Sequence, residues 1–244
     1  MNLLEVACDT VSSALAAQAG GADRIELVAA LGEGGLTPSL GKFLAIKEQV
    51  DIPVFVMIRP RRADFCYAEA DFAEMLRDVA LFREHGADGL VSGVLLPNGT
   101  VDQTRTAQLR EAAGPLPFTF HRAIDLCVDL PEAMETLIRL GIDRILTSGG
   151  EASAPAGADM IRALAEQAQG RIALMAGAGV TPDTLPTLLN IPGLTEFHAS
   201  AKKVVASQMT HRGRAAMGHE AADTEYRWYE SDQETIATLK RQLA

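Results

Sequence analysis

The stretch Leu140–Gly149, LGIDRILTSG, joins the end of one helix to the strand that follows it. A glycine stands where a left-handed helix cap is needed, an aspartate follows it, and an apolar run of strand length comes next. The same order of residues recurs in Gly20–Leu27 (GGADRIEL) and in His85–Gly93 (HGADGLVSG). This repeated junction predicts that helices and strands alternate along the chain.

Eight apolar runs of strand length are spaced along the 244 residues. They are Leu3–Cys8, Arg24–Val28, Pro53–Arg59, Gly89–Leu95, Phe118–Arg122, Arg144–Ser148, Arg171–Gly177 and Thr195–Ser200. Helix-length segments separate them, and Thr37-Pro38 and Thr181-Pro182 predict where helices begin. No linker rich in Pro, Gly or Ser divides the chain. We therefore predict a single α/β domain over residues 1–244, a (β/α)₈ TIM barrel, with an open α/β sheet as the alternative.

Composition and charge exclude several functional classes. Hydrophobic residues make up 48% and charged residues 22% of the chain, as in an average soluble domain. The formal net charge of −10, with only short basic clusters, argues against a nucleic-acid-binding surface. No apolar stretch approaches the roughly 20 residues that span a bilayer, and no signal-peptide pattern opens the chain. We expect a cytoplasmic protein that binds neither nucleic acid nor a membrane.

The three cysteines give no sign of a metal site or a disulfide framework. Cys8, Cys66 and Cys127 form no CxxC pair and are odd in number. We expect each of them to be a reduced thiol.

A polar segment of about residues 201–230 follows the last predicted strand and breaks the alternation. It carries histidine, methionine and aromatic side chains. Long loops in compact domains are usually functional or interfacial, and this one would emerge at the active face of a barrel. We predict a long loop that acts as a lid or a subunit contact, with a plain surface excursion as the alternative.

Charged residues stand at inward-facing positions on five predicted strands. They are Glu5, Glu26, Arg59, His121 and His198. Because (β/α)₈ enzymes react at the carboxyl ends of their strands, these positions predict a small-molecule site. Carboxylates are unfavourable when buried alone, so we expect Arg59 or Arg122 to pair with Glu5 and Glu26. The alternative is a buried ion-pair network that only sets the strand register.

Two kinds of chemistry fit these residues. Imidazoles beside carboxylates can transfer protons near neutral pH, which makes Glu26 and His121, together with Glu5 and His198, acid–base candidates. The turn from Gly177 to Gly179 precedes a predicted helix start, and its backbone N–H groups can hold an anion. Lys202 and Arg59 would reinforce the binding of that anion. A tight turn without any ligand is the alternative for the two glycines.

Seven segments together resemble the CutC family of copper homeostasis proteins. They are GGADRIEL, EGGLTPSLG, PVFVMIRPR, GADGLV, FTFHRAID, ILTSGG and EFHASAKK. The resemblance runs from about Asn2 to Trp228 and into the last helix. It implies a cytoplasmic (β/α)₈ barrel that forms a homo-oligomer, a dimer or tetramer, and a link to copper without a defined reaction.

The resemblance also bears on copper ligands. Family members proposed to bind copper carry cysteines at the positions of Ala7 and Val28 here, where two thiolates would suit Cu(I). Cys8 is shifted by one residue and is expected to face the helices. We therefore assign no metal ligand and expect no Cu(I) site through that pair. The family pattern is kept at Glu5, Glu26, Arg59, His121, Arg122, Asp125, Ser148, His198 and Ser200. On this resemblance we expect Arg122, Asp125, Ser148 and Ser200 to bind the ligand.

Three functional hypotheses follow. The first is a role in copper homeostasis, and the alternative is an enzyme or binder that acts on a small anionic metabolite, such as a phosphorylated one, at the barrel mouth. A third is a non-catalytic oligomeric scaffold. Whether the protein is an enzyme stays open at this point.

Overall fold

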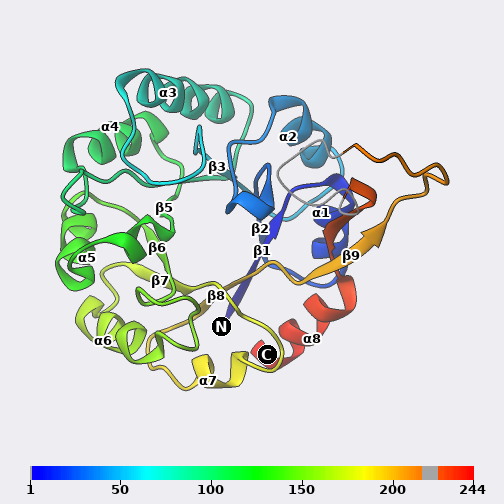
Figure 1. Ribbon diagram of the computed structural model, residues 1–244. Coiled ribbons are helices and arrows are strands. Elements are labelled where there is room, and N and C mark those ends of the chain that lie inside the picture. The colour runs from blue at the N-terminus through cyan, green and yellow to red at the C-terminus, as the bar shows by residue number, and fades with distance from the viewer. Residues whose placement is uncertain (1, 216–224) are drawn as a thin grey trace.

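A closed barrel of eight parallel strands forms the centre of the protein in the computed structural model, which describes residues 2–215 and 225–244 (Figure 1). The strands are β1 (Leu3–Cys8), β2 (Arg24–Leu27), β3 (Val54–Met57), β4 (Gly89–Ser92), β5 (Phe118–Phe120), β6 (Arg144–Thr147), β7 (Ala173–Ala176) and β8 (Glu196–Ala199). Pairing of β8 with β1 closes the ring and rules out the open sheet. The predicted (β/α)₈ barrel is confirmed, and each predicted run contains one strand.

A ring of helices covers the outside of the barrel (Figure 1). The helices are α1 (Val11–Ala19), α2 (Leu40–Lys47), α3 (Glu69–Glu84), α4 (Gln103–Ala113), α5 (Leu130–Arg139), α6 (Ala158–Ala168), α7 (Leu185–Leu189) and α8 (Gln233–Leu243), with 3₁₀ turns η1 (Leu31–Glu33) and η2 (Arg122–Leu126). The helix start predicted at Thr181-Pro182 is wrong, because α7 begins only after Thr184. Among residues 2–215 and 225–244, none of these helices has the length and apolar character of a membrane span.

The repeated junction has two physical roles in the barrel. Its glycines end the preceding helices with positive φ angles, +86° at Gly21, +84° at Gly86 and +70° at Gly141. Its aspartates accept a backbone hydrogen bond from the preceding strand: Asp23 from Leu4 at 2.7 Å, Asp88 from Val54 at 2.8 Å and Asp143 from Phe118 at 2.8 Å. Each junction therefore ties an even-numbered strand to the odd-numbered strand before it.

Side chains alternate between the inside of the barrel and the layer under the helices. In β1, Leu4, Val6 and Cys8 belong to the large apolar core under the helices. The inside of the barrel holds a smaller apolar cluster of Val28, Phe55, Met57 and Val91. Glu5 of β1 is completely buried and faces the opposite way from Leu4 and Val6. This alternation places charged side chains inside the barrel.

Part of the predicted loop of residues 201–230 is β structure. Strands β9 (Lys202–Ala206) and β10 (Arg227–Ser231) pair antiparallel in a ribbon that is separate from the barrel sheet. Figure 1 shows β9 and the chain that follows it projecting beyond the ring of helices. Residues 216–224 of the predicted loop lie outside the described residues.

Candidate functional site

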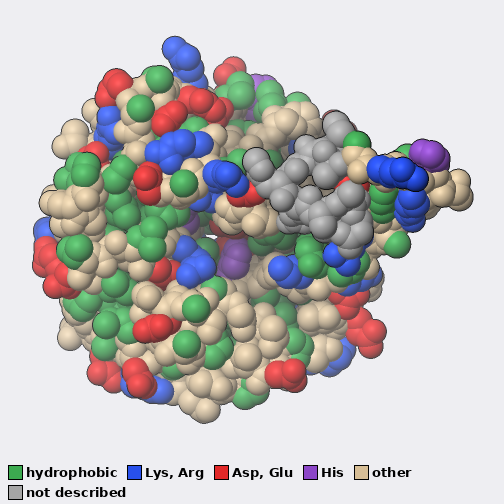
Figure 2. Space-filling view, viewed as in Figure 1, with side chains coloured by type: hydrophobic (Ala, Val, Ile, Leu, Met, Phe, Trp, Pro, Cys, Tyr) green, Lys and Arg blue, Asp and Glu red, His purple; other side chains and the backbone are tan. Residues whose placement is uncertain are grey.

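A pocket of about 920 Å³ opens at the carboxyl ends of the barrel strands. Figure 2 shows it as a hollow near the centre of this face, with a histidine in it and a basic side chain at its edge. It brings together predicted site residues Glu26, Arg59, His121, Arg122, Asp125, Gly179, His198, Ser200 and Lys202. The other three predicted residues, Glu5, Ser148 and Gly177, do not line its wall.

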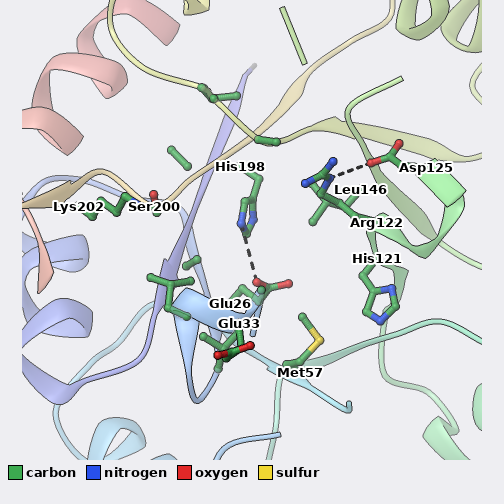
Figure 3. Close-up of a pocket in the computed structure, with 18 of the residues that line it drawn as sticks. Glu26, Glu33, Met57, His121, Arg122, Asp125, Leu146, His198, Ser200 and Lys202 are labelled. Carbon is green, nitrogen blue, oxygen red and sulfur yellow. Dashed lines mark hydrogen bonds and ion pairs between the residues drawn. The ribbon is translucent and has the colours of Figure 1, made fainter. Parts of the chain in front are cut away.

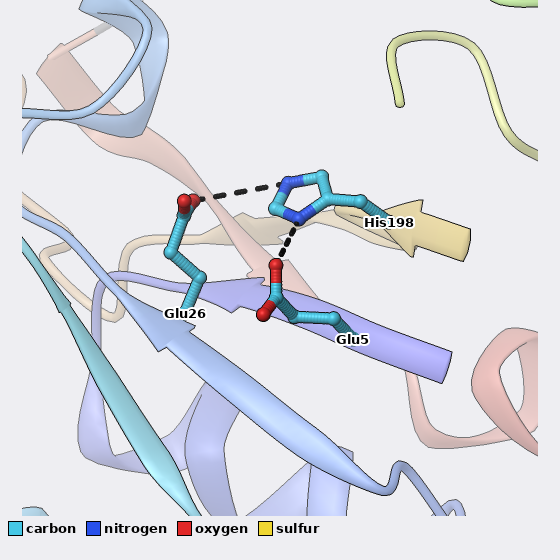
Figure 4. A group of neighbouring side chains, drawn as sticks. All are labelled: Glu5, Glu26 and His198. Carbon is cyan, nitrogen blue, oxygen red and sulfur yellow. Dashed lines mark hydrogen bonds and ion pairs between the residues drawn. The ribbon is translucent and has the colours of Figure 1, made fainter. Parts of the chain in front are cut away.

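Glu5, His198 and Glu26 form a cluster at the bottom of the pocket (Figure 4). His198 Nδ1 lies 2.8 Å from a carboxylate oxygen of Glu5, and its Nε2 lies 3.8 Å from a carboxylate oxygen of Glu26. Barrel closure causes this arrangement, because β1 lies between β2 and β8 and its Glu5 is in register with His198. The imidazole therefore stands between a carboxylate beneath the pocket and one on its wall.

Burial and neighbouring charges push the pKa values of this cluster apart. Burial opposes ionisation of Glu5, but the charges of Arg24 and His198 outweigh it and lower its pKa to about 2. Burial also opposes ionisation of Glu26, and here it outweighs the charges of His198 and Arg24 and raises the pKa to about 7. Burial disfavours the charged form of His198, yet the carboxylates of Glu26 and Glu5 prevail and raise its pKa. One proton is therefore available to His198 and Glu26 near neutral pH.

The partner of Glu5 is Arg24, not Arg59 or Arg122 as the sequence suggested. Arg24 is 4% exposed and binds both Glu5 and Glu196, and Arg144 binds Glu196 in turn. Two carboxylates and two guanidinium groups thus balance one another inside the barrel. Strand alternation was the signal for Arg24, since it lies two residues before Glu26 on the same face of β2.

The side chain of Arg59 is hydrogen-bonded to the loops at the mouth of the barrel. Its guanidinium donates hydrogen bonds of 3.0 Å to the carbonyl oxygens of Glu33, Gly35 and Ala63. It also lies 4.9 Å from the centre of the Phe65 ring. Arg59 is predicted correctly as a residue of the mouth, but its contacts hold the loops after β2 and β3.

His121 is a buried, neutral imidazole. Its Nδ1 accepts a hydrogen bond from the backbone N–H of Ala123 at 3.2 Å, so the remaining proton sits on Nε2. Burial, with the positive charge of Arg59, lowers the pKa of His121 to about 3. At neutral pH this side chain is therefore a hydrogen-bond donor rather than an acid.

Arg122, Asp125 and Ser148 form a hydrogen-bonded group beside the pocket. Arg122 binds Asp125 at 2.8 Å, and the hydroxyl of Ser148 donates to the same carboxylate at 2.9 Å while it accepts from Arg122. Ser148 therefore positions Arg122 and Asp125, which both line the pocket. Figure 3 shows Arg122 and Asp125 joined in this way.

The predicted anion-binding helix terminus after β7 is not formed. Helix α7 has five residues and begins well after Gly179. Gly177 has a packing role, because a Cβ there would lie 2.5 Å from the side chain of Leu146. Gly179 does line the pocket, and Lys202 lies at its rim with its ammonium group 4.7 Å from the centre of the Tyr229 ring.

Thiol ligands are missing from the pocket wall. Ala7 and Val28 line it at the positions where members proposed to bind copper are expected to carry cysteines, and none of Cys8, Cys66 and Cys127 lines it. Cys8 is buried with its sulfur 4.0 Å from the hydroxyl of Ser231, on the side of the strand that faces the helices, as predicted. A thiolate site for Cu(I) does not fit this pocket, whereas imidazole and carboxylate ligands are present.

The sequence is similar to proteins of the CutC family. A model of the CutC family matches residues 2–203. The human copper homeostasis protein cutC homolog is 46% identical over 238 residues, which cover 97% of this chain and 87% of that protein. A family protein CutC from Klebsiella pneumoniae is 46% identical over 242 residues, which cover 98% of this chain and 97% of that protein.

A solved structure of a CutC protein also resembles this chain. The crystal structure of a CutC protein from Streptococcus agalactiae matches with a TM-score of 0.78 at 31% identity. The match covers 82% of this chain and 99% of that one. Sequence and fold together show that this chain belongs to the CutC family.

Proposed function

We propose that this chain acts in copper homeostasis, as the names of its relatives state for them, and that it binds copper at the barrel mouth through His198 and Glu26. The observation that supports the site is the cluster of Glu5, Glu26 and His198. Among the described residues, it is the one group of three such side chains with ligand atoms within 4.8 Å of one another. The names of the relatives favour this role over an enzyme acting on an anionic metabolite.

The contacts of the cluster suit a metal ion. His198 Nε2 and the Glu26 carboxylate face each other at 3.8 Å, so one ion with bonds of about 2 Å can bind both. The second oxygen of Glu26 is buried and has no hydrogen-bond partner within the described chain. Glu5 holds the other ring nitrogen of His198, as carboxylates next to metal-binding histidines commonly do.

The ligand set selects the oxidation state. Imidazole and carboxylate groups suit Cu(II), whereas Cu(I) prefers sulfur ligands, which the cysteines do not supply here. Nitrogen and oxygen sites bind Cu(II) more tightly than Zn(II) or Mn(II). We therefore propose a Cu(II) site in which Glu5 orients His198 without binding the ion.

Titration with Cu(II) tests the proposed site. We expect His198→Ala and Glu26→Gln each to weaken binding by at least about tenfold, and Glu5→Gln to weaken it by about 10–100-fold through loss of the orienting contact. Calorimetry gives the affinities, and electron paramagnetic resonance reports nitrogen coordination of the copper. Exposed His85, changed to alanine, is the matched control.

The cysteines supply the opposing test. A variant with serine at Cys8, Cys66 and Cys127 is expected to bind Cu(II) as the wild type does. If copper binding is lost in this variant, or is unchanged in His198→Ala, the site is elsewhere and the assignment is wrong.

We also propose that the protein is a cytoplasmic homo-oligomer. Three unpaired cysteines support the compartment, because disulfides are rare in the cytosol. The ribbon of β9 and β10 supports the assembly. Val204 and Tyr229, opposite each other on it, are 58% and 51% exposed, and neighbouring Trp228 is 43% exposed. Exposed apolar groups of this kind mark interfaces.

Replacing Val204 and Tyr229 together by glutamate is expected to convert a dimer or tetramer into a monomer, because the new charges would lose solvation in the contact. Light scattering coupled to size-exclusion chromatography measures the mass. Leu81→Glu is the control, since Leu81 is an exposed apolar residue on α3, away from β9 in Figure 1. A wild-type monomer would contradict the proposal.

A further inference from the structure

The pocket is much larger than a copper ion requires. Its volume of about 920 Å³ lies within the range of about 300–1,000 Å³ that is typical of small-molecule sites. Figure 3 shows Glu26 and His198 close together, with His121 on another part of the wall. That second part, formed by the chain after β3 and β5, carries two polar groups that the copper site does not use, Arg59 and His121.

Arg59 brings a positive charge into the wall without a negative partner. The residue is 6% exposed, and its guanidinium binds three carbonyl oxygens. No carboxylate of the described residues lies within ion-pair distance of it, unlike Arg24, Arg122 and Arg144. Buried charges in proteins are normally paired. An anion in the pocket would supply the missing charge.

His121 brings an unused hydrogen-bond donor to the same part of the wall. The residue is 3% exposed, and its Nε2 has no hydrogen-bond partner among the described residues. The Phe65 ring packs against both groups, with its centre 4.7 Å from the imidazole centre and 4.9 Å from the Arg59 guanidinium carbon. A buried donor left unsatisfied is unfavourable, so a ligand oxygen that accepts a hydrogen bond from it would be held strongly.

We infer that the mouth binds a small organic oxyanion, a carboxylate or a phosphate monoester, whose oxygen accepts a hydrogen bond from His121 and whose charge balances Arg59. The rest of the wall suits an organic molecule, because apolar side chains complete it. They are Leu31, Met57, Phe65, Leu126, Leu146 and Val180. This subsite does not depend on copper, and the two ligands would occupy different parts of one pocket.

Thermal unfolding of chelator-treated protein with small probes tests the subsite. The probes are malonate and inorganic phosphate, with malonamide as an uncharged analogue of malonate and with chloride to match ionic strength. We expect a saturable rise in Tm with malonate, phosphate or both, and none with malonamide. A response to malonate alone identifies a carboxylate ligand, and a response to phosphate alone identifies a phosphate ester.

A histidine variant links the response to the site. In His121→Asn the side-chain oxygen can still accept from Ala123, but the Nε2–H donor is lost. We expect the affinity for the active probe to fall by about tenfold or more, as for other hydrogen bonds to charged groups. His85→Asn, on the outside of the barrel, is expected to bind as the wild type does. Nitrogen NMR of the imidazole then reports a shift of His121 Nε2 on binding, whatever the stability of the variants.

The inference is overturned if no probe raises Tm beyond chloride, if malonamide acts like malonate, or if His121→Asn binds unchanged. Because the chelator removes copper from these measurements, failure of the copper site leaves their outcome unaffected. Conversely, Cu(II) titration without probes is independent of the oxyanion.

Discussion

Replacing Arg24 by methionine is expected to lower the free energy of unfolding by about 3–5 kcal/mol, because removing one partner leaves buried charge uncompensated. Arg24 is 4% exposed and is the one residue that joins Glu5 to Glu196 in the described structure. Without it, Glu5 keeps His198 and Glu196 keeps Arg144 as the sole ionic partners among the described residues. Urea denaturation at constant pH measures the change.

A second substitution separates charge from packing. Adding Glu5→Leu to Arg24→Met removes both charges, so we expect the double variant to regain much of the lost stability. Arg62→Met is the control, because Arg62 pairs with Glu33 on the surface and such pairs contribute about 0–1 kcal/mol. If Arg24→Met costs no more than Arg62→Met, the network does not hold the barrel together.

The stability of the metal-free protein is expected to fall as Glu26 ionises. In the folded state the pKa of Glu26 is about 7 because of burial, against 4.5 ordinarily, so the folded state binds this proton more tightly than the unfolded chain. At about 1.4 kcal/mol per pKa unit, about 3 kcal/mol present at low pH is lost as pH rises from about 4.5 through about 7. The raised pKa of His198 adds to the loss in the same direction.

The variant Glu26→Gln isolates this effect. Its stability relative to wild type is expected to improve by about 3 kcal/mol between about pH 5 and about pH 8. Urea denaturation across this range, with a chelator present, measures it. Glu111→Gln, at an exposed position of α4, controls for the loss of one negative charge. A constant difference between Glu26→Gln and wild type would show that Glu26 ionises as it would in water.

At acidic pH the stability of the fold is expected to fall because of two other groups, Glu5 and His121. Because the folded pKa values of Glu5 and His121 are lowered to about 2 and about 3, their contributions are present at neutral pH. The contribution of His121 is lost as pH falls from 6.5, the ordinary pKa of histidine, toward about 3. The contribution of Glu5 is lost at lower pH, between 4.5 and about 2.

Local signals in the sequence determined the barrel. Apolar runs of strand length and the junction of glycine and aspartate predict all eight strands, because periodicity and capping depend on residues close together in the chain. Side-chain alternation along these strands also predicted that Glu26, Arg59, His121 and His198 would share one pocket at the mouth of the barrel. The weak points were helix starts and the segment after β8, where residues 202–206 and 227–231 pair across a long separation.

The partners of these residues depended on the tertiary structure. Closure of the ring places β1 between β2 and β8, in a register that sets Glu5 beside Arg24 and His198. Arg59, expected to pair with a carboxylate, instead binds loop carbonyls. Alternation along a strand shows which way a side chain points. Which side chain it meets is decided by strand register and loop conformation, which involve residues far apart in the sequence.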